Sequence, residues 1–127
     1  MGHSKLTVDQ YHMMYEYMQD LVGVSEAFQY LDGADETKSR PKQVFKDTVL
    51  AFEKINQSHS YIVEYMNDQE FFQTLLEEFH EVVLTFEKWA ETKPTDVKVE
   101  VLSQQLIPSY ENWKSKMQAT IIPYIAH

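Results

Sequence analysis

The residues best suited to bind a metal are pairs of an acid and a histidine three positions apart. Glu77 and His80 form a Glu-x-x-His motif, which holds paired irons in some four-helix bundles, and Asp9 with His12 imitates it. Helical phase argues against a metal at either pair. If Phe79 faces the core, steps of about 100° per residue place His80 at the flank and Glu77 almost opposite the core. We therefore predict no metal site.

His59 differs from these pairs because it lies within an apolar stripe, between Ile55 and Ile62. A buried imidazole needs a hydrogen-bond partner, which the eight tyrosines and many carboxylates of the chain can supply. We predict a hydrogen-bonded core histidine, with Asn56 as a second buried polar residue near the same face. The alternative is a ligand pocket or a pH-sensitive contact built around His59, since burial and pairing move the pKa of histidine.

The residue pattern supports no other kind of catalytic site. Spacing assembles no serine, histidine and acid into a nucleophilic triad, and the three glycines form no phosphate-binding loop. Cysteine is absent, which excludes disulfides and zinc–thiolate sites and fits a reducing compartment. We predict that the protein is not an enzyme and that it uses no cofactor.

Four stretches of the chain repeat apolar residues at alternating spacings of three and four. This spacing keeps side chains on one narrow stripe of an α-helix, along which neighbouring helices pack. The connections are short, which favours antiparallel neighbours. The sequence therefore predicts an all-α fold, an up-down-up-down antiparallel four-helix bundle in which residues 1–127 form one domain. The predicted helices are long and cover about 8–32, 40–66, 68–91 and 95–125.

Local residues indicate where these helices begin, end and bend. Thr7 and Gln10 match a capping box at the start of the first helix, and Gly33 is expected to end it in the left-handed conformation. The second helix is predicted to continue through residues 56–60, because the stripe keeps its phase there despite a loop-like composition. Pro108 removes a backbone hydrogen bond inside the fourth helix, so we expect a kink there.

Charge and hydropathy exclude several classes of partner. The chain has 20 acidic and 11 basic residues and a net charge of −9. Such a surface repels phosphate backbones and anionic membranes, so we expect no nucleic acid and no membrane as partner. No apolar run approaches the ~18 residues of a membrane span, and we expect a cytoplasmic location. Residues 1–4 are assigned no role.

Two groups of apolar residues fall outside the expected core stripes. The apolar face of the first helix is wide, and we predict that its second edge binds a partner helix. This edge consists of Met13, Tyr17, Val24 and Leu31. Leu50 and Tyr61 of the second helix and Leu84 of the third point opposite the core, and they form a candidate self-association surface.

These surfaces favour a small acidic protein-binding module, adaptor-like or chaperone-like, that docks a helix or loop of a protein partner. One alternative is a self-associating structural protein that forms a homodimer. Another is a bundle that binds a ligand or metal through the buried His59. The sequence identifies neither the partner nor the biological process.

Segments of the second half resemble a known group of proteins. Residues 55–61, 107–114 and 123–127 are similar to small uncharacterised helical-bundle proteins of Bacillus-like bacteria, and the likeness extends over about residues 45–127. The resemblance implies a bacterial, cytoplasmic protein and supplies no function. In architecture alone, a small acidic bundle with a Trp-Lys step late in its last helix is similar to flagellar export chaperones, which wrap a helix of a partner.

Overall fold

The computed structural model describes residues 6–126 as an all-α bundle of four long helical segments, with no strand in this range. The first segment is α1 (Val8–Leu31), and the second is α2 (Ser39–Ile62), which the short 3-10 turn η1 (Val63–Tyr65) extends. The third segment is α3 (Gln69–Glu91). The predicted all-α four-helix fold is confirmed.

The fourth segment changes its helical type along its length. It consists of α4 (Asp96–Glu100), the π-helix η2 (Val101–Leu106) and α5 (Ile107–Ile125), which follow one another without a break. At the end of the π-helix the Ile107 amide donates to the Leu102 carbonyl, one residue farther back than in an α-helix. Pro108 follows in the first turn of α5, where a missing N–H is tolerated. The kink at Pro108 stays a prediction.

Local side chains and glycine geometry set the ends of α1. The Thr7 hydroxyl accepts a hydrogen bond from the Gln10 amide at 3.1 Å, and the Gln10 side chain accepts one from the Thr7 amide at 3.0 Å. This reciprocal pair is the predicted capping box. Beyond the last residue of α1, Gly33 has a φ of 90°, a conformation that glycine adopts without steric cost. Gly33 thus has the positive φ that was expected of the glycine ending this helix.

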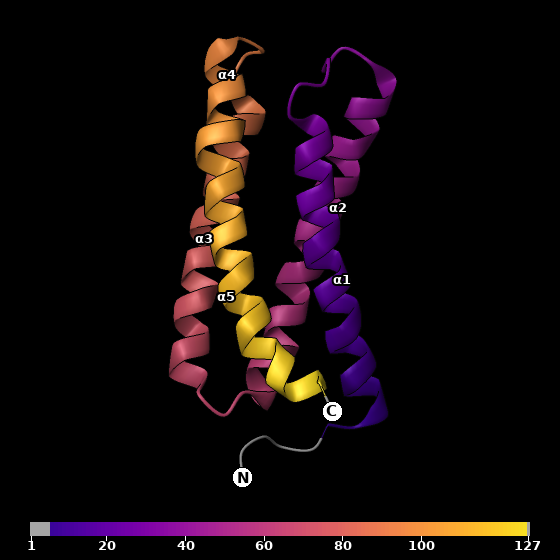
Figure 1. The fold of residues 1–127 in the computed structure, drawn as a ribbon, viewed down its shortest axis with the longest axis vertical. Coiled ribbons are helices and arrows are strands. Elements are labelled where there is room, and N and C mark those ends of the chain that lie inside the picture. The colour runs from indigo at the N-terminus through magenta and orange to yellow at the C-terminus, as the bar shows by residue number, and fades with distance from the viewer. Residues whose placement is uncertain (1–5, 127) are drawn as a thin grey trace.

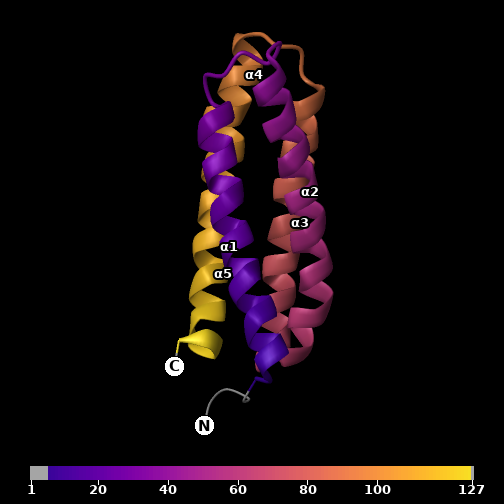
Figure 2. The same ribbon diagram turned by 90° about the vertical axis from the view of Figure 1, so that its right-hand side faces the viewer.

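The ribbon pairs α1 with α2 on one side and α3 with the α4–α5 rod on the other (Figure 1). The loops that join α1 to α2 and α3 to α4 lie at one end of the bundle, which we call the loop end. The α2–α3 connection and the C-terminal end of α5 lie at the opposite end (Figure 2). Backbones approach closely between α1 and α2, α1 and α5, and α3 and α5, but at few points between α2 and α3.

Aromatic rings fill the middle of the core. The ring of Phe52 lies 4.9–6.1 Å from the rings of Phe28, Phe79, Phe86 and Tyr110, measured between centroids. These rings come from all four long segments, so one side chain links every helix of the bundle. Removing a buried Phe typically costs about 3–5 kcal/mol of folding free energy. Among residues 6–126, no helix combines the length and the apolar character that crossing a bilayer requires.

Candidate functional site

The predicted partner-binding edge of α1 is wrong, because most of it lies in the core. Tyr17 and Val24 are each 1% exposed, Leu31 is 7% exposed, and Met13 is half-buried. The α1 helix packs against both α2 and α5, so its buried face must be wide. The wide apolar arc thus reflects two helix contacts rather than a surface for another chain.

His59 is a buried, hydrogen-bonded residue of α2. Its Nε2 atom lies 2.7 Å from the Tyr17 hydroxyl, and the side chain is 3% exposed. Burial lowers the pKa of His59 from 6.5 to about 4 and raises the pKa of Tyr17, so near neutral pH the phenol donates to an uncharged imidazole. Asn56 does not join this contact: it is exposed, and its predicted burial is wrong. One helical step of about 100° carries Asn56 from the core stripe at Ile55 to the flank of α2.

The predicted self-association residues are exposed, as their helical phase indicates. Leu50 is 61% exposed, Tyr61 58% and Leu84 46%. Their role in self-association stays a prediction.

The acid–histidine pairs lie on the surface of the bundle. Glu77 and His80 are exposed on α3, and Asp9 and His12 are exposed on α1. Within residues 6–126, the structure brings together no group of three or more acidic or histidine side chains that could hold a metal ion.

Polar side chains bridge three of the four pairs of neighbouring helices. Tyr17 and His59 join α1 to α2. The Tyr110 hydroxyl donates to the Leu21 carbonyl at 2.6 Å, which joins α5 to α1. The indole N–H of Trp113 donates to the Leu75 carbonyl at 2.9 Å and so joins α5 to α3. Each of these contacts is buried, where a hydrogen bond also fixes the relative position of two helices.

The remaining pair, α2 and α3, is joined differently. Across the described part of the chain, no side-chain hydrogen bond or ion pair connects α2 with α3, and the two helices meet through apolar and aromatic side chains of the core. The rings of Phe45 and Phe86 stack with centroids 5.6 Å apart, and those of Phe52 and Phe86 lie 4.9 Å apart. Above these rings an open cavity of about 550 Å³ separates the two helices. We call this cavity the lateral groove.

The lateral groove has an apolar floor and an acidic rim. Its floor is formed by Phe45, Phe52, His59, Phe79 and Phe86, and its sides by Val49, Leu76, Val83 and Ala90. The side residues are half-buried, so apolar surface from both helices remains open to solvent. Glu53, Glu87 and Glu91 are exposed along the same groove, and His80 and Asn56 are its other exposed polar residues. An apolar cleft with a few polar groups at its edge is the usual form of a binding site.

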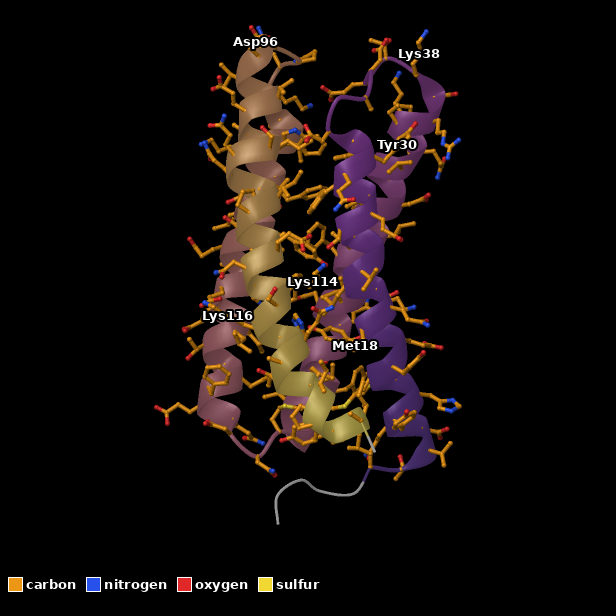
Figure 3. All side chains as sticks on the ribbon, viewed as in Figure 1. Met18, Tyr30, Lys38, Asp96, Lys114 and Lys116 are labelled. Carbon is orange, nitrogen blue, oxygen red and sulfur yellow. The ribbon has the colours of Figure 1, made fainter. Side chains whose placement is uncertain are left out.

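A second cavity, the end pocket, lies at the loop end and has a volume of about 490 Å³. Residues of α1, α2, α3, α4 and η2 line it, together with the loop between α1 and α2. Figure 3 labels Lys38 and Asp96 at this end of the molecule. The pocket contains the buried Lys98, whose ammonium lies 2.6 Å from a carboxylate oxygen of Glu36. Phe45 and Ala90 line both cavities, so the end pocket adjoins the lateral groove.

Both cavities lie within a recognised domain. Residues 12–116 match the family model of DUF8042, a domain of unknown function. The chain belongs to this family. The matched range contains every residue that lines the lateral groove and the end pocket. A search of curated proteins and a search of solved structures each gave no match.

Sequence reasoning missed both cavities of this DUF8042 domain. The groove residues Val49 of α2 and Leu76, Val83 and Ala90 of α3 recur at helical spacings beside the core stripes. That spacing marks a second apolar stripe on α3, and it is the signal that could have located the groove. Lys98 carried no such signal, because a lysine side chain normally lies in solvent.

Proposed function

We propose that this protein is a non-catalytic binding module that takes a basic amphipathic helix of a protein partner into the lateral groove, in the cytoplasm of a bacterium. The observation that carries the proposal is the combination of half-buried apolar side chains, which lie over a buried aromatic floor, with an acidic rim between α2 and α3. Amphipathic helices commonly bind in such a way, with one apolar face in a groove and residues at i, i+3, i+4 and i+7 as anchors.

The length of the groove suits a short helical segment. The lining residues of α2 run from Phe45 to His59, and those of α3 run from Leu76 to Glu91. At 1.5 Å per residue, about fifteen residues of helix span roughly 20 Å, which is the length of about four helical turns. A partner helix lying along the groove can therefore place three or four apolar side chains between Val49 and Val83.

The charge of the rim specifies the chemistry of the partner. Glu53, Glu87 and Glu91 give the groove three negative charges, and the whole chain carries −9. Lysine or arginine at the flanks of the partner's apolar face would complement these carboxylates, whereas an acidic helix would be repelled. Exposed carboxylates of this kind contribute more to the association rate and to partner choice than to affinity.

Self-association through Leu50, Tyr61 and Leu84 is the second candidate, because all three are exposed apolar residues on α2 and α3. This surface is separate from the lateral groove, since none of the three residues lines it. Light scattering across a concentration series distinguishes the two proposals. A protein that stays monomeric at high concentration argues against the homodimer and leaves the groove proposal intact.

A pair of synthetic peptides tests the groove. The first is a helix of leucine and lysine with leucine at i, i+3, i+4 and i+7, and the second has the same composition in scrambled, non-amphipathic order. We expect the amphipathic peptide to bind saturably, as measured by fluorescence anisotropy, and to bind at least about tenfold more tightly than the scrambled one. Equal binding of the two peptides would show attraction by net charge alone and would contradict the proposal.

Two neighbouring residues of α3 provide a matched pair of variants for this titration. Val83 is half-buried on the side of the groove, and Leu84 is exposed outside it. Val83→Glu should abolish binding of the amphipathic peptide, because it places a charge on the apolar contact surface. Leu84→Glu adds the same charge one residue away and should leave binding unchanged. Equal effects of the two variants would remove the lateral groove as the binding site.

A further inference from the structure

The end pocket is a second cavity, which the proposed peptide-binding function does not use. Its volume of about 490 Å³ falls in the range of small-molecule pockets, about 300–1,000 Å³. Most of its wall is apolar and comes from Leu31, Pro41, Phe45, Trp89 and Leu102. Such a wall accommodates an aliphatic or aromatic group and excludes water from it.

A single buried cation lies inside this apolar wall. Lys98 is 7% exposed, and its ammonium lies 4.9 Å from the centroid of the Trp89 ring, a cation–π distance. An ammonium group has three hydrogen-bond donors. Within residues 6–126 the structure gives the Lys98 ammonium one hydrogen-bond acceptor, a carboxylate oxygen of Glu36 at 2.6 Å. Lys98 is therefore a buried point of attachment for a carboxylate.

The carboxylate that now occupies this point comes from a loop. Glu36 belongs to the connection between α1 and α2, and its side chain is 39% exposed, against 9% for the side chain of Lys98. Rotation of the Glu36 side chain toward solvent would free the ammonium without moving a helix. A buried charge left without its partner is strongly destabilised, so a replacement anion at Lys98 is favoured.

The remaining charges of the lining also favour an anion. Lys42 and Lys46 line the pocket with Lys98, whereas its two acids are Asp32 and Glu36. Three positive charges against two negative ones give the lining a net charge of +1, in a chain whose total is −9. The end pocket thus has the opposite sign to the lateral groove, whose rim carries Glu53, Glu87 and Glu91.

The geometry points to a binding site for an amphipathic carboxylate, such as a medium-chain fatty acid, whose carboxylate replaces that of Glu36 on Lys98 while its apolar chain lies against Trp89 and Phe45. Because Phe45 and Ala90 line both cavities, a longer chain would extend along these two residues toward the lateral groove. The inference stands on the end pocket alone and does not depend on the peptide-binding proposal.

Decanoate and decanol, which share an apolar chain and differ in charge, test this site by calorimetric titration. The wild-type protein should bind decanoate at least about tenfold more tightly than decanol, because a charge-assisted bond to a buried ammonium is a strong one. Glu36→Gln removes the internal competitor, and it should strengthen decanoate binding about fivefold or more and leave decanol binding unchanged. Lys98→Met should abolish the preference for decanoate.

Lys114→Met is the matched control, because Lys114 is also a partly buried lysine, paired with Glu111 at 2.9 Å, but does not line the end pocket. It should keep the wild-type preference for decanoate. Equal affinity for decanoate and decanol, or no saturable binding of either by wild type, would overturn the inference. If Lys98→Met does not fold, the titration of Glu36→Gln tests the site alone. Decanoate binding to Glu36→Gln that is unchanged or weaker than to wild type would contradict the site. Failure of the leucine–lysine peptide to bind would leave these results unaffected.

Discussion

The α1–α5 face and the α2–α3 face of the bundle both contain aromatic side chains, but they are closed by different contacts. Between α1 and α5, the Tyr110 hydroxyl reaches the Leu21 carbonyl, and Ser25 contacts both Glu111 and Lys114. Between α2 and α3, the described residues make apolar and aromatic contacts without a side-chain hydrogen bond or ion pair, and an open cavity of about 550 Å³ remains. The first face is sealed by directional polar bonds, and the second stays open.

This difference indicates which face is available to a partner. Buried hydrogen bonds fix the separation of two helices, because breaking one leaves an unpaired polar group in the core. When a contact between two rings is lost, no polar group is left unpaired in the core. Such a contact can therefore be replaced by a contact with another apolar side chain. An incoming apolar side chain can therefore replace solvent in the lateral groove without breaking a polar bond of the bundle.

The largest effect on stability is expected between α3 and α5, which a buried hydrogen bond also joins. Trp113 lies 4.7 Å from Phe79 and 5.7 Å from Tyr110 between ring centroids, and its indole donates to the Leu75 carbonyl. Trp113→Ala should lower the free energy of unfolding in urea by about 3–5 kcal/mol. Trp113→Phe retains an aromatic ring but lacks the indole N–H donor, and it should lower the free energy of unfolding much less. A loss below about 1 kcal/mol for the alanine variant would contradict the buried, hydrogen-bonded position of Trp113 between α3 and α5.

The Tyr17–His59 contact predicts how stability depends on pH. The pKa of His59 is about 4 in the folded protein, below its ordinary value of 6.5, so the unfolded chain takes up the proton first as pH falls. Stability contributed by the neutral imidazole is complete above pH 6.5 and is lost as pH falls toward 4, by about 3 kcal/mol in total.

A double variant separates this effect from the titration of carboxylates. Tyr17→Phe with His59→Leu replaces both buried partners by apolar groups, an exchange that is often nearly neutral. The difference in unfolding free energy between wild type and this variant, measured from pH 4 to 7, isolates His59. A difference that stays constant over this range would show that His59 is not buried as a neutral group.

The smallest expected change in stability is the one that distinguishes two adjacent valines of α3. Val82 is 3% exposed in the core, and Val83 is half-buried on the side of the lateral groove. Val82→Ala should cost about 1–2 kcal/mol, whereas Val83→Ala should stay within about 0.5 kcal/mol, since alanine also has the higher helix propensity. Thermal unfolding of the two variants measures this difference. Equal losses would indicate that the groove is part of the packed core.

Periodicity predicted the fold because packing of apolar stripes determines it. The stripe through residues 56–60 kept its phase, and α2 runs through this segment without a break. Local capping signals were equally informative, as Thr7 and Gln10 show. No capping side chain marks the start of α2, where Lys38 occupies the N-cap position and its side chain makes no capping hydrogen bond.

Periodicity was a poor guide to the candidate site because it describes one helix at a time. Tyr17, Val24 and Leu31 formed an apolar edge in the sequence, and only the positions of α2 and α5 show that they are covered. The residues of the lateral groove, in contrast, are left uncovered, because the backbones of α2 and α3 approach each other at few points. Lys98 is buried through a contact with Glu36, 62 residues away in the chain, which no local pattern specifies.

The most direct test of the binding proposal is a map of where the leucine–lysine peptide contacts the protein. Backbone amide shifts of the isotope-labelled protein, followed by NMR during titration with this peptide, provide the map residue by residue. We predict that the largest changes occur at Phe45, Val49, Val83 and Ala90, which line the lateral groove. Changes concentrated on the outer surface of α1 and α5, such as at Val22 and Ile122, would contradict the account.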